Sequence, residues 1–349
     1  MSVRRASALA ATVAGAVVVA WSTTGAQATA PGSNGKIAFS RYRLTSNPYR
    51  EEIFVANPDG TGARRITTSP ANYLDEQPDW SPDGRKLAFS RCPEDLDPNG
   101  TCRVYTVNAD GTGLRQVGPG CTTPSACEWD LDPAWSPDGS TIAFTHEWGP
   151  VVGTSPNDQI EHSEIFLMTA DGSDPRQLTH VTDPGFTADV RAAAWSPDGK
   201  QLVFTVHNSR RGKPPGGRTL YVVNADGTGL RRLTPWSLHG GDHPDWAPDG
   251  SRIVFTFVRG ENRGDLYTIR PDGTGLHRLT HSVASTTMLS GSYSPDGRSI
   301  VFATSAGATA HCTGCPIYPD VFVMRPDGTR IRPLIRSRNW DGGPDWGPR

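Results

Sequence analysis

Short apolar runs recur along the chain from Lys36 onward and are separated by polar turns. One set begins just after an Asp-Gly or Asn-Gly pair and comprises Ile37-Ala-Phe39, Leu87-Ala-Phe89, Ile142-Ala-Phe144, Leu202-Val-Phe204, Ile253-Val-Phe255 and Ile300-Val-Phe302. A second apolar run follows each of these and ends in a further Asp-Gly, at 53–60, 104–111, 165–172, 220–227, 266–273 and 321–328. Short runs rich in β-branched and aromatic residues between such turns predict β-strands, and nothing in the chain carries a long helical period.

An aromatic residue and a tight turn precede these pairs of apolar runs. Trp-Ser-Pro-Asp-Gly stands at 80–84, 135–139 and 195–199, Trp-Ala-Pro-Asp-Gly at 246–250, Tyr-Ser-Pro-Asp-Gly at 293–297, and a partial copy, Pro-Asp-Trp-Gly-Pro, at 344–348. A short Arg-bearing run, such as Arg231-Arg-Leu-Thr234, follows the second apolar run in most copies. Each copy therefore predicts a four-stranded meander. Because its two middle strands are apolar at nearly every position, we expect them to be buried on both faces, as in blades packed side by side.

Six copies of this unit predict an all-β fold, a six-bladed β-propeller with four-stranded blades. The chain opens on a second strand near Lys36 and finishes on an orphan first strand, 343–346. If these two segments pair, they complete the first blade. We therefore expect the C-terminal strand to close the ring by pairing with the N-terminal blade.

The first 28 residues have a different pattern. Arg4 and Arg5 precede an apolar stretch from Ala6 to Ala20, and Ala26-Gln27-Ala28 supplies the small residues of a cleavage site. We expect 1–28 to be a secretory signal peptide and 29–349 to be a single propeller domain, secreted or held in the periplasm or cell envelope, with no membrane span after cleavage. An uncleaved N-terminal anchor is the alternative.

Six cysteines agree with an oxidising compartment, where disulfides persist. They fall into three pairs that are close in sequence, and we expect three local disulfides: Cys92–Cys102, Cys121–Cys127 and Cys312–Cys315. The last pair also has the spacing of a redox or metal-binding C-x-x-C motif, although a zinc site would need two further ligands nearby.

The repeated W-S-P-D-G-x-x-[IL]-[AV]-F and [IL]-[FY]-x-x-N-x-D-G-T-G motifs resemble the repeats of TolB-type β-propellers. The resemblance covers essentially the whole chain after the predicted signal peptide and implies the propeller fold. TolB proper carries an additional N-terminal α/β domain, whereas the first repeat here starts within a few residues of the predicted cleavage site. The resemblance therefore implies a relative of the propeller half of TolB.

Charge and motifs narrow the functional classes. The 34 basic and 36 acidic residues give a formal net charge of −2, which offers no bulk electrostatic attraction for nucleic acid. The sequence contains no G-x-S-x-G elbow, H-E-x-x-H helix motif, P-loop or G-x-G-x-x-G fingerprint. Propellers can still use scattered His, Asp and Glu residues for metal-dependent catalysis, and no short motif reveals these.

The turns of a meander alternate between two faces of a propeller. The Asp-Gly turns share one face, and their aspartates serve the turns. The opposite face carries the variable loops and the mouth of the central channel, where inner strands begin with Asp132, Asp242, His243 and Asp341. Hard oxygen ligands favour Ca²⁺, so we expect a divalent cation, preferably Ca²⁺, at these residues. The alternative is a hydrated polar channel wall.

Aromatic and imidazole side chains on the same face are candidates for a binding surface: Trp148, His162, Trp236 and Trp340. They can stack on a sugar or anchor a protein partner, or they can fill the junctions between blades. Together these features favour a monomeric, non-enzymatic binding scaffold for an envelope or extracellular protein or glycan. A metal-dependent lactonase or polysaccharide lyase at the channel mouth is the alternative, and a purely structural ring is the third hypothesis.

Overall fold

The computed structural model describes residues 31–42, 50–93, 101–118, 129–152, 159–182, 187–209, 217–238, 240–258, 264–282, 286–306, 321–337 and 339–349. The predicted signal peptide, 1–28, lies outside them. Within the described part of the chain, regular structure is almost entirely β-strand, and η2 (Trp236–Leu238) is a single 3-10 turn. No helix in this part is long and apolar enough to cross a membrane.

The strands form antiparallel units of four, numbered here along the chain. Unit 1 contains β24 (Trp340–Pro348), β1 (Asn34–Tyr42), β2 (Arg50–Ala56) and β3 (Arg64–Arg65), and unit 2 contains β4 (Tyr73–Trp80), β5 (Lys86–Pro93), β6 (Arg103–Asn108) and β7 (Arg115–Gln116). Unit 3 contains β8 (Trp129–Trp135), β9 (Thr141–Val152), β10 (Gln159–Thr169) and β11 (Arg176–Gln177), and unit 4 contains β12 (Thr187–Trp195), β13 (Gln201–Ser209), β14 (Arg218–Asn224) and β15 (Arg231–Arg232). Unit 5 contains β16 (Asp242–Trp246), β17 (Ile253–Val258), β18 (Gly264–Ile269) and β19 (His277–Arg278), and unit 6 contains β20 (Thr286–Tyr293), β21 (Ile300–Ala306), β22 (Val321–Met324) and β23 (Arg332–Ile335).

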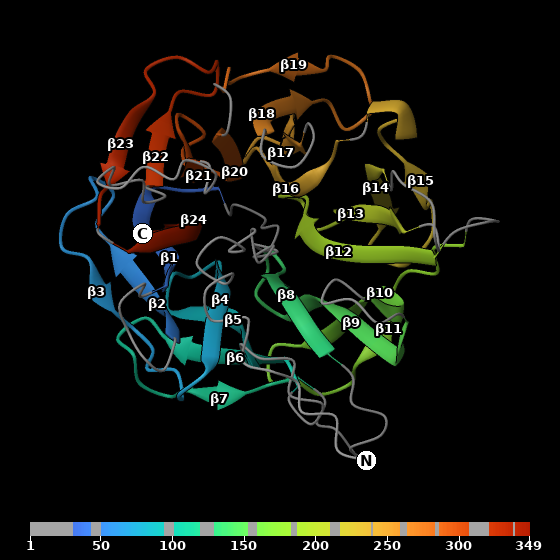
Figure 1. Cartoon of the computed structure of the whole chain (residues 1–349), viewed down its shortest axis with the longest axis horizontal. Coiled ribbons are helices and arrows are strands. Elements are labelled where there is room, and N and C mark those ends of the chain that lie inside the picture. The colour runs from blue at the N-terminus through green and yellow to red at the C-terminus, as the bar shows by residue number, and fades with distance from the viewer. Residues whose placement is uncertain are drawn as a thin grey trace, which may run out of the picture.

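The units surround a central axis (Figure 1). The first strand of each meander lies innermost, namely β4, β8, β12, β16, β20 and β24, and the short strands β3, β7, β11, β15, β19 and β23 lie outermost. Brief parallel contacts join neighbouring units, for example Gly264↔Thr287 between β18 and β20. The prediction of an all-β propeller built from four-stranded units is confirmed.

The hydrophobic core lies between neighbouring units. Ile53 and Val55 of unit 1 share one buried cluster with Leu87 and Phe89 of unit 2. The largest fully buried side chains include one phenylalanine from the second strand of every unit: Phe39, Phe89, Phe144, Phe204, Phe255 and Phe302. Burying such a side chain stabilises the fold by roughly 1.5–3 kcal/mol. The middle strands are therefore buried on both faces, as the apolar runs predicted.

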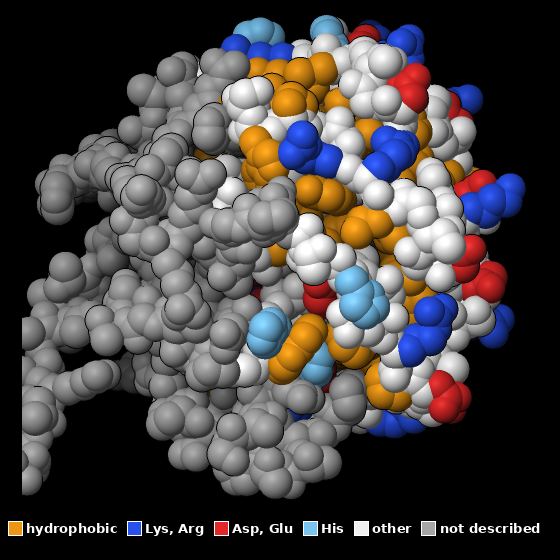
Figure 2. All heavy atoms as spheres, turned by 90° about the vertical axis from the view of Figure 1, so that its right-hand side faces the viewer, with side chains coloured by type: hydrophobic (Ala, Val, Ile, Leu, Met, Phe, Trp, Pro, Cys, Tyr) orange, Lys and Arg blue, Asp and Glu red, His pale blue; other side chains and the backbone are white. Residues whose placement is uncertain are grey.

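The outer rim is polar. The arginines of β3, at 64–65, and of β15, at 231–232, are exposed. Figure 2 shows one side of the molecule, where basic and acidic side chains are interspersed among apolar ones without a continuous field of one sign. This surface agrees with the small net charge of the chain.

Every inner strand contains an irregularity three residues before its aromatic residue. There the backbone enters the left-handed region, with φ between 49° and 58°, at Gln77, Asp132, Ala192, His243, Ser290 and Gly343. The antiparallel register shifts at the same places, for example between Leu131 and Ala134. Left-handed residues other than glycine are uncommon and strained, so their recurrence marks a built feature of the channel wall. It gives two of the predicted metal ligands, Asp132 and His243, an orientation that differs from that of ordinary strand residues.

The two ends of the described chain meet in unit 1. β24 pairs antiparallel with β1, with Ile37 opposite Trp346 and Tyr42 opposite Trp340. The amide of Arg349 also donates to the carbonyl oxygen of Ser33 at 2.9 Å. The predicted pairing between the C-terminal strand and the segment that begins at Lys36 is therefore present.

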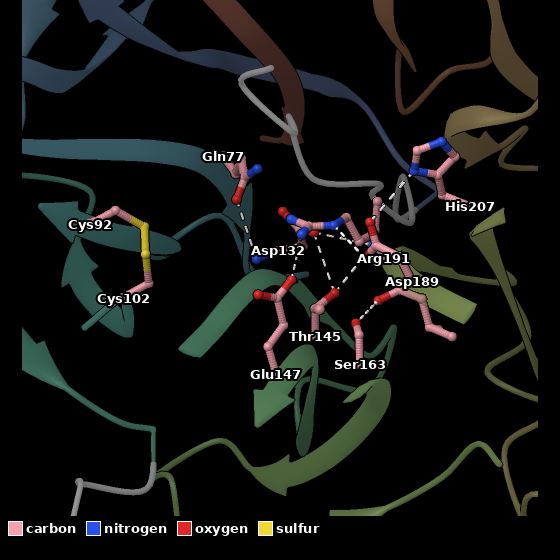
Figure 3. Close-up of polar contacts among 12 residues, drawn as sticks. Gln77, Cys92, Cys102, Asp132, Thr145, Glu147, Ser163, Asp189, Arg191 and His207 are labelled. Carbon is pink, nitrogen blue, oxygen red and sulfur yellow. Dashed lines mark hydrogen bonds and ion pairs between the residues drawn. A yellow bond between two sulfur atoms is a disulfide. The ribbon is translucent and has the colours of Figure 1, made fainter. Parts of the chain in front are cut away.

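Cys92 and Cys102 form a disulfide, as predicted (Figure 3). This bridge connects the end of β5 to the start of β6 on the face opposite the Asp-Gly turns. The other four cysteines, Cys121, Cys127, Cys312 and Cys315, lie outside the described residues.

Candidate functional site

Ion pairs line the channel mouth, which is the end of the channel where the inner strands begin. In unit 1, Nε of Arg41 lies 2.6 Å from Oδ1 of Asp341, and its second nitrogen donates to Oδ2 at 2.8 Å. In unit 2, Arg91 makes the same two contacts with Asp75, at 2.5 and 2.8 Å. Each arginine stands directly opposite its aspartate on the neighbouring strand. Cross-strand placement therefore produces a two-pronged pair in both units.

Unit 3 carries a related contact. Nδ1 of His146 lies 2.8 Å from Oδ1 of Asp130, which is its cross-strand partner. Arg103 approaches the second oxygen of the same carboxylate at 3.7 Å. The aspartate position of units 1 and 2 is thus kept, while its contacts come from an imidazole on β9 and a guanidinium on β6.

A network replaces the simple pairs where units 3 and 4 meet (Figure 3). Arg191 of β12 contacts Oδ1 of Asp189 through Nε at 2.7 Å and Oε1 of Glu147 on β9 through its terminal nitrogen at 2.6 Å. His207 lies 3.7 Å from the other oxygen of Asp189. In the adjoining region Arg218 pairs with Asp242 of unit 5. Charged groups of three units are therefore linked across unit boundaries, and we call these residues, with Asp132, the Arg191 network.

The acids of this network have displaced pKa values. Burial raises the pKa of Asp132 to about 8, although Arg191 opposes the shift. Burial likewise raises the pKa of Glu147 to about 7, again against the effect of Arg191. For Asp189 burial acts in the same direction, but Arg191 and His207 together outweigh it, and the pKa falls to about 2. Near neutral pH, Asp189 is therefore ionised, Asp132 mostly holds a proton, and Glu147 is close to its midpoint.

Two further predicted metal-ligand positions bear on this network: Asp132 belongs to it, and His243 lies beside it. The Oδ2 atom of Asp132 accepts hydrogen bonds from the amide of Ala192 at 3.2 Å and from the hydroxyl of Thr145 at 3.3 Å. His243 is buried, and its Nδ1 lies 3.4 Å from Oδ1 of Asp242. Burial lowers the pKa of His243, so the imidazole is neutral at pH 7. Among the described residues neither nitrogen of this ring has a hydrogen-bond partner.

The predicted calcium ligands do not form one group. Asp341 is engaged by Arg41 and Asp242 by Arg218, so two of the carboxylates already have a cation. In the part of the chain that the structure describes, no three His, Cys, Asp or Glu side chains are arranged to hold a metal ion. Sequence reasoning named these acids without the arginines. A signal for the arginine existed in units 1 and 2, where it follows the buried phenylalanine and a serine at 39–41 and 89–91.

Most of the predicted binding aromatics take part in packing. Trp148 is stacked on His146 at 5.4 Å and on His162 at 5.3 Å between ring centroids, within the long β9–β10 hairpin. Trp340 meets Tyr42 edge to face at 6.5 Å, and Trp236 packs against a core cluster. His162 is the exposed member of the set. The hairpin of unit 3 therefore presents an exposed imidazole close to the glutamate of the Arg191 network.

A different set of aspartates stabilises the opposite end of the channel. The amides of Trp135, Tyr293 and Trp80 donate to carboxylates of the preceding unit, namely Asp79 at 2.6 Å, Asp245 at 2.7 Å and Asp345 at 2.9 Å. These acids link one inner strand to the next, so they are structural. Sequence reasoning missed them, although all three stand in a Pro-Asp-Trp triplet.

Comparison with known proteins gives no family model that matches the chain. Among curated proteins, it is 23% identical over 210 residues to the uncharacterized peptidase YuxL of Bacillus subtilis, which covers 51% of this chain and 29% of that protein. It is 34% identical over 128 residues to dipeptidyl-peptidase 5 of Porphyromonas endodontalis (36% and 15%) and 27% identical over 226 residues to the uncharacterized protein Atu1656 of Agrobacterium fabrum (62% and 62%). The chain thus spans less than two thirds of each of these relatives.

Solved structures identify the fold. TolB from Acinetobacter baumannii aligns with a TM-score of 0.63 at 20% identity, over 90% of this chain and 67% of that one. Putative TolB from Agrobacterium tumefaciens gives 0.59 at 23% identity (89% and 92%), and oligogalacturonate lyase in complex with manganese gives 0.51 at 19% identity (78% and 71%). Identities this low establish architecture and not activity. The chain has the fold of a TolB-type β-propeller.

Proposed function

We propose that this protein is an extracytoplasmic TolB-like propeller that works as a monomeric, non-enzymatic scaffold and binds an envelope or extracellular protein or glycan at its channel mouth. The Arg191 network carries this proposal. Its charged groups are shared among units, whereas Arg41 and Arg91 each pair with an aspartate of their own unit. Arg191 keeps 22% of its side chain exposed. An ionised aspartate, a titrating glutamate and a fixed guanidinium offer both hydrogen-bond donors and acceptors to a polar partner.

Location follows from the sequence pattern that precedes the propeller. The charged, apolar and small-residue regions of 1–28 support export, and the disulfide between Cys92 and Cys102 supports an oxidising compartment. We infer that the mature chain acts outside the cytoplasm, in the periplasm or cell envelope or as a secreted protein.

We further propose that the units are six blades of a closed ring. Support comes from the β1–β24 pairing and from contacts at the outer rim. A Cβ atom on Gly60 of unit 1 would lie 2.1 Å from the carbonyl oxygen of Leu334 in unit 6, and one on Gly111 would lie 3.0 Å from that of Ile66 in the preceding unit. The same close approach thus recurs between the last unit and the first. Removing residues 336–349 should expose the edge of β1 and cause aggregation.

An enzymatic alternative has one observation in its favour. Asp132, which holds a proton near neutral pH, and His243, which is neutral, occupy equivalent positions of units 3 and 5 and can act as acid and base. A metal-dependent lactonase or polysaccharide lyase would also need a cation, and the described residues offer no group of three ligands for it. The peptidase names of two relatives do not carry over, because the chain spans only 29% and 15% of those proteins and lacks a G-x-S-x-G motif.

Site-specific photo-crosslinking tests the scaffold proposal. The crosslinking amino acid replaces exposed His162 beside the channel mouth or, as a matched control, exposed Lys200 on the Asp-Gly turn face. In the cells that produce the protein, we expect a discrete adduct from position 162 and none from position 200. Arg191→Lys should abolish the adduct, because lysine cannot bridge Asp189 and Glu147 as the guanidinium does. Equal adducts at both positions, or an adduct that survives Arg191→Lys, would overturn the proposal.

A further inference from the structure

Two glutamates meet where the first unit contacts the second, at the unit 1–2 junction. Glu51 lies on β2 and Glu76 on β4, and a short parallel ladder, Arg50↔Tyr73 and Glu51↔Leu74, joins these strands at the channel mouth. The two carboxyl groups are hydrogen-bonded to each other. Glu51 is 7% exposed and Glu76 is half-buried. We call this contact the Glu51–Glu76 pair.

The hydrogen bond between the two carboxyl groups requires a proton, because an ionised carboxylate can only accept. Burial, followed by the charge of Glu76, raises the pKa of Glu51 well above its ordinary value. Burial also raises the pKa of Glu76 to about 7, although the hydrogen bond with Glu51 opposes the shift. The pair therefore holds at least one proton at neutral pH.

The groups around the pair supply no cation to replace this proton. Asp75, which precedes Glu76, raises the pKa of both glutamates further. In the part of the chain that the structure describes, no ion pair joins either glutamate to a basic side chain, and the half-buried Arg50 next to Glu51 is no exception. The other charged groups of the adjoining strands pair among themselves: Arg41 with Asp341, Arg65 with Glu52 and Arg91 with Asp75. The remaining titratable side chains at this end of β1 and β4 are Tyr42 and Tyr73.

The equivalent contact at the unit 4–5 junction has opposite charges. The cross-strand registers make Glu51 equivalent to Arg218 and Glu76 equivalent to Asp242. Arg218 and Asp242 form an ion pair between their units. Although burial opposes the shift, Arg218 lowers the pKa of Asp242, so this pair stays ionised. Unit 1 thus has an acid where unit 4 has an arginine, and a proton takes the place of the missing cation.

We propose that the Glu51–Glu76 pair is a pH-dependent switch: its proton holds the mouth ends of β2 and β4 together, and without that proton the two carboxylates repel each other and the unit 1–2 junction opens. Unit 1 is also where β24 and β1 bring the two ends of the described chain together. The switch therefore acts on the unit that contains both ends. It does not depend on what binds at the Arg191 network.

The direction of the pH dependence follows from proton binding. The folded pair retains protons that an ordinary glutamate releases near pH 4.3 or so, roughly its unperturbed pKa. Stability of the junction must therefore fall as the pH rises from about 5 through about 7 and above, because the folded state binds more protons than the unfolded state there. The Arg218–Asp242 pair has no such excess of protons, so the unit 4–5 junction provides an internal reference.

Hydrogen exchange at the two junctions tests the proposal on the unsubstituted chain. Amide protection is measured by mass spectrometry at pH 6 and pH 9 and corrected for the intrinsic exchange rate at each pH. We expect protection of 50–56 and 73–80 to fall at least about tenfold, which corresponds to one pKa unit of linkage. Segments 218–224 and 242–246 should keep their protection. An equal fall at both junctions, or no fall at the first, would overturn the proposal.

Replacing Glu51 separates the switch from the general effect of a buried acid. Glu51→Gln gives Glu76 a permanent amide donor, and Glu51→Arg copies the arrangement of Arg218 and Asp242. Either variant should have nearly the same protection at the unit 1–2 junction at pH 6 and pH 9. A tenfold fall that persists in both variants would contradict the switch.

Glu164→Gln is the matched control. Glu164 is a buried glutamate on β10 of unit 3, and its carboxylate accepts from the hydroxyl of Thr179 and the amide of Val181 instead of bonding another acid. Burial raises its pKa as well. The variant should therefore alter overall stability with pH and still show the tenfold fall at the unit 1–2 junction. Loss of that fall in Glu164→Gln would show that the pH dependence is not local to the Glu51–Glu76 pair, and the proposal would be wrong.

Discussion

The two sides of the channel mouth hold their charges differently. In units 1 and 2 one arginine faces one aspartate across neighbouring strands, as Arg41–Asp341 and Arg91–Asp75 do. On the side of units 3 to 5, Arg191 is shared between Asp189 of its own unit and Glu147 of unit 3, and Arg218 pairs with Asp242 of unit 5. Arg41 and Arg91 each bond one aspartate of their own unit, whereas the guanidinium of Arg191 is divided between carboxylates of two units. For this reason we place the proposed binding site on the side of units 3 to 5.

The two sides should differ most in the free energy of unfolding that is lost when an arginine is replaced, and Arg41→Met should have the larger effect. Arg41→Met leaves the carboxylate of Asp341 fully buried without its cation, and removing one partner of a buried pair costs about 3–5 kcal/mol. We expect a loss of this size in the free energy of unfolding, measured by urea denaturation at pH 7. The double variant Arg41→Met with Asp341→Asn should recover much of it, because no unpaired charge remains. If the single variant loses under about 1 kcal/mol, Arg41 and Asp341 do not stabilise unit 1 as a buried ion pair.

Arg191→Met should have a smaller effect. Asp189 retains His207 at 3.7 Å, and Glu147 can take up a proton because its pKa is already about 7. We expect a loss of about 1–3 kcal/mol at pH 7, smaller at pH 6 and larger at pH 8, where Glu147 must ionise without its cation. Urea unfolding at the three pH values measures this. A loss as large as that of Arg41→Met, without pH dependence, would contradict the contrast between the two sides.

Much of the fold could be predicted from the sequence, because the same pattern of strands and turns occurs in every unit. The apolar runs, the Asp-Gly turns and the orphan strand at 343–346 were enough to predict a propeller and the pairing of its ends. Cys92 and Cys102 could be paired because they close a short loop. Strands, turns and a short disulfide loop are set by residues that are close together in the chain, so the sequence shows them directly.

The site was harder to predict for a physical reason. Arg41 and Asp341 are 300 positions apart, and only the register of β1 against β24 brings them together. The left-handed residues of the inner strands share no side-chain type, since Gln77, Ala192 and His243 have little in common. Their conformation is set by hydrogen bonds between units, such as the amide of Asp132 donating to Ser90 at 3.0 Å. The predicted calcium ligands were chosen without this knowledge of their partners.

The proton held by Asp132 predicts how stability depends on pH on the side of the Arg191 network. The folded state keeps a proton on this carboxyl up to about pH 8, whereas the unfolded chain releases it near pH 4, so stability must fall as the pH rises between these values. Asp132→Asn retains a neutral group of similar shape and removes this dependence. Relative to the natural chain, the variant should gain at least about 1 kcal/mol between pH 5 and pH 8 in urea unfolding. Parallel pH profiles for the two proteins would show that Asp132 is ionised throughout.

Calcium should have the smallest effect. The site predicted from the sequence, at Asp132, Asp242, His243 and Asp341, would require the ion to displace Arg218 and Arg41 from two carboxylates and a proton from the third. A bound ion at a hundredfold excess over its dissociation constant would stabilise the fold by about 2.7 kcal/mol, which corresponds to a rise in Tm of several degrees. Because of the displaced partners, we expect millimolar Ca²⁺ to shift the Tm of the chelator-treated protein by less than about 1 °C. Arg41→Met frees Asp341 and should increase this shift if calcium and arginine compete for one carboxylate. A shift of several degrees in the natural chain would instead restore the calcium site, and with it the metal-dependent alternative.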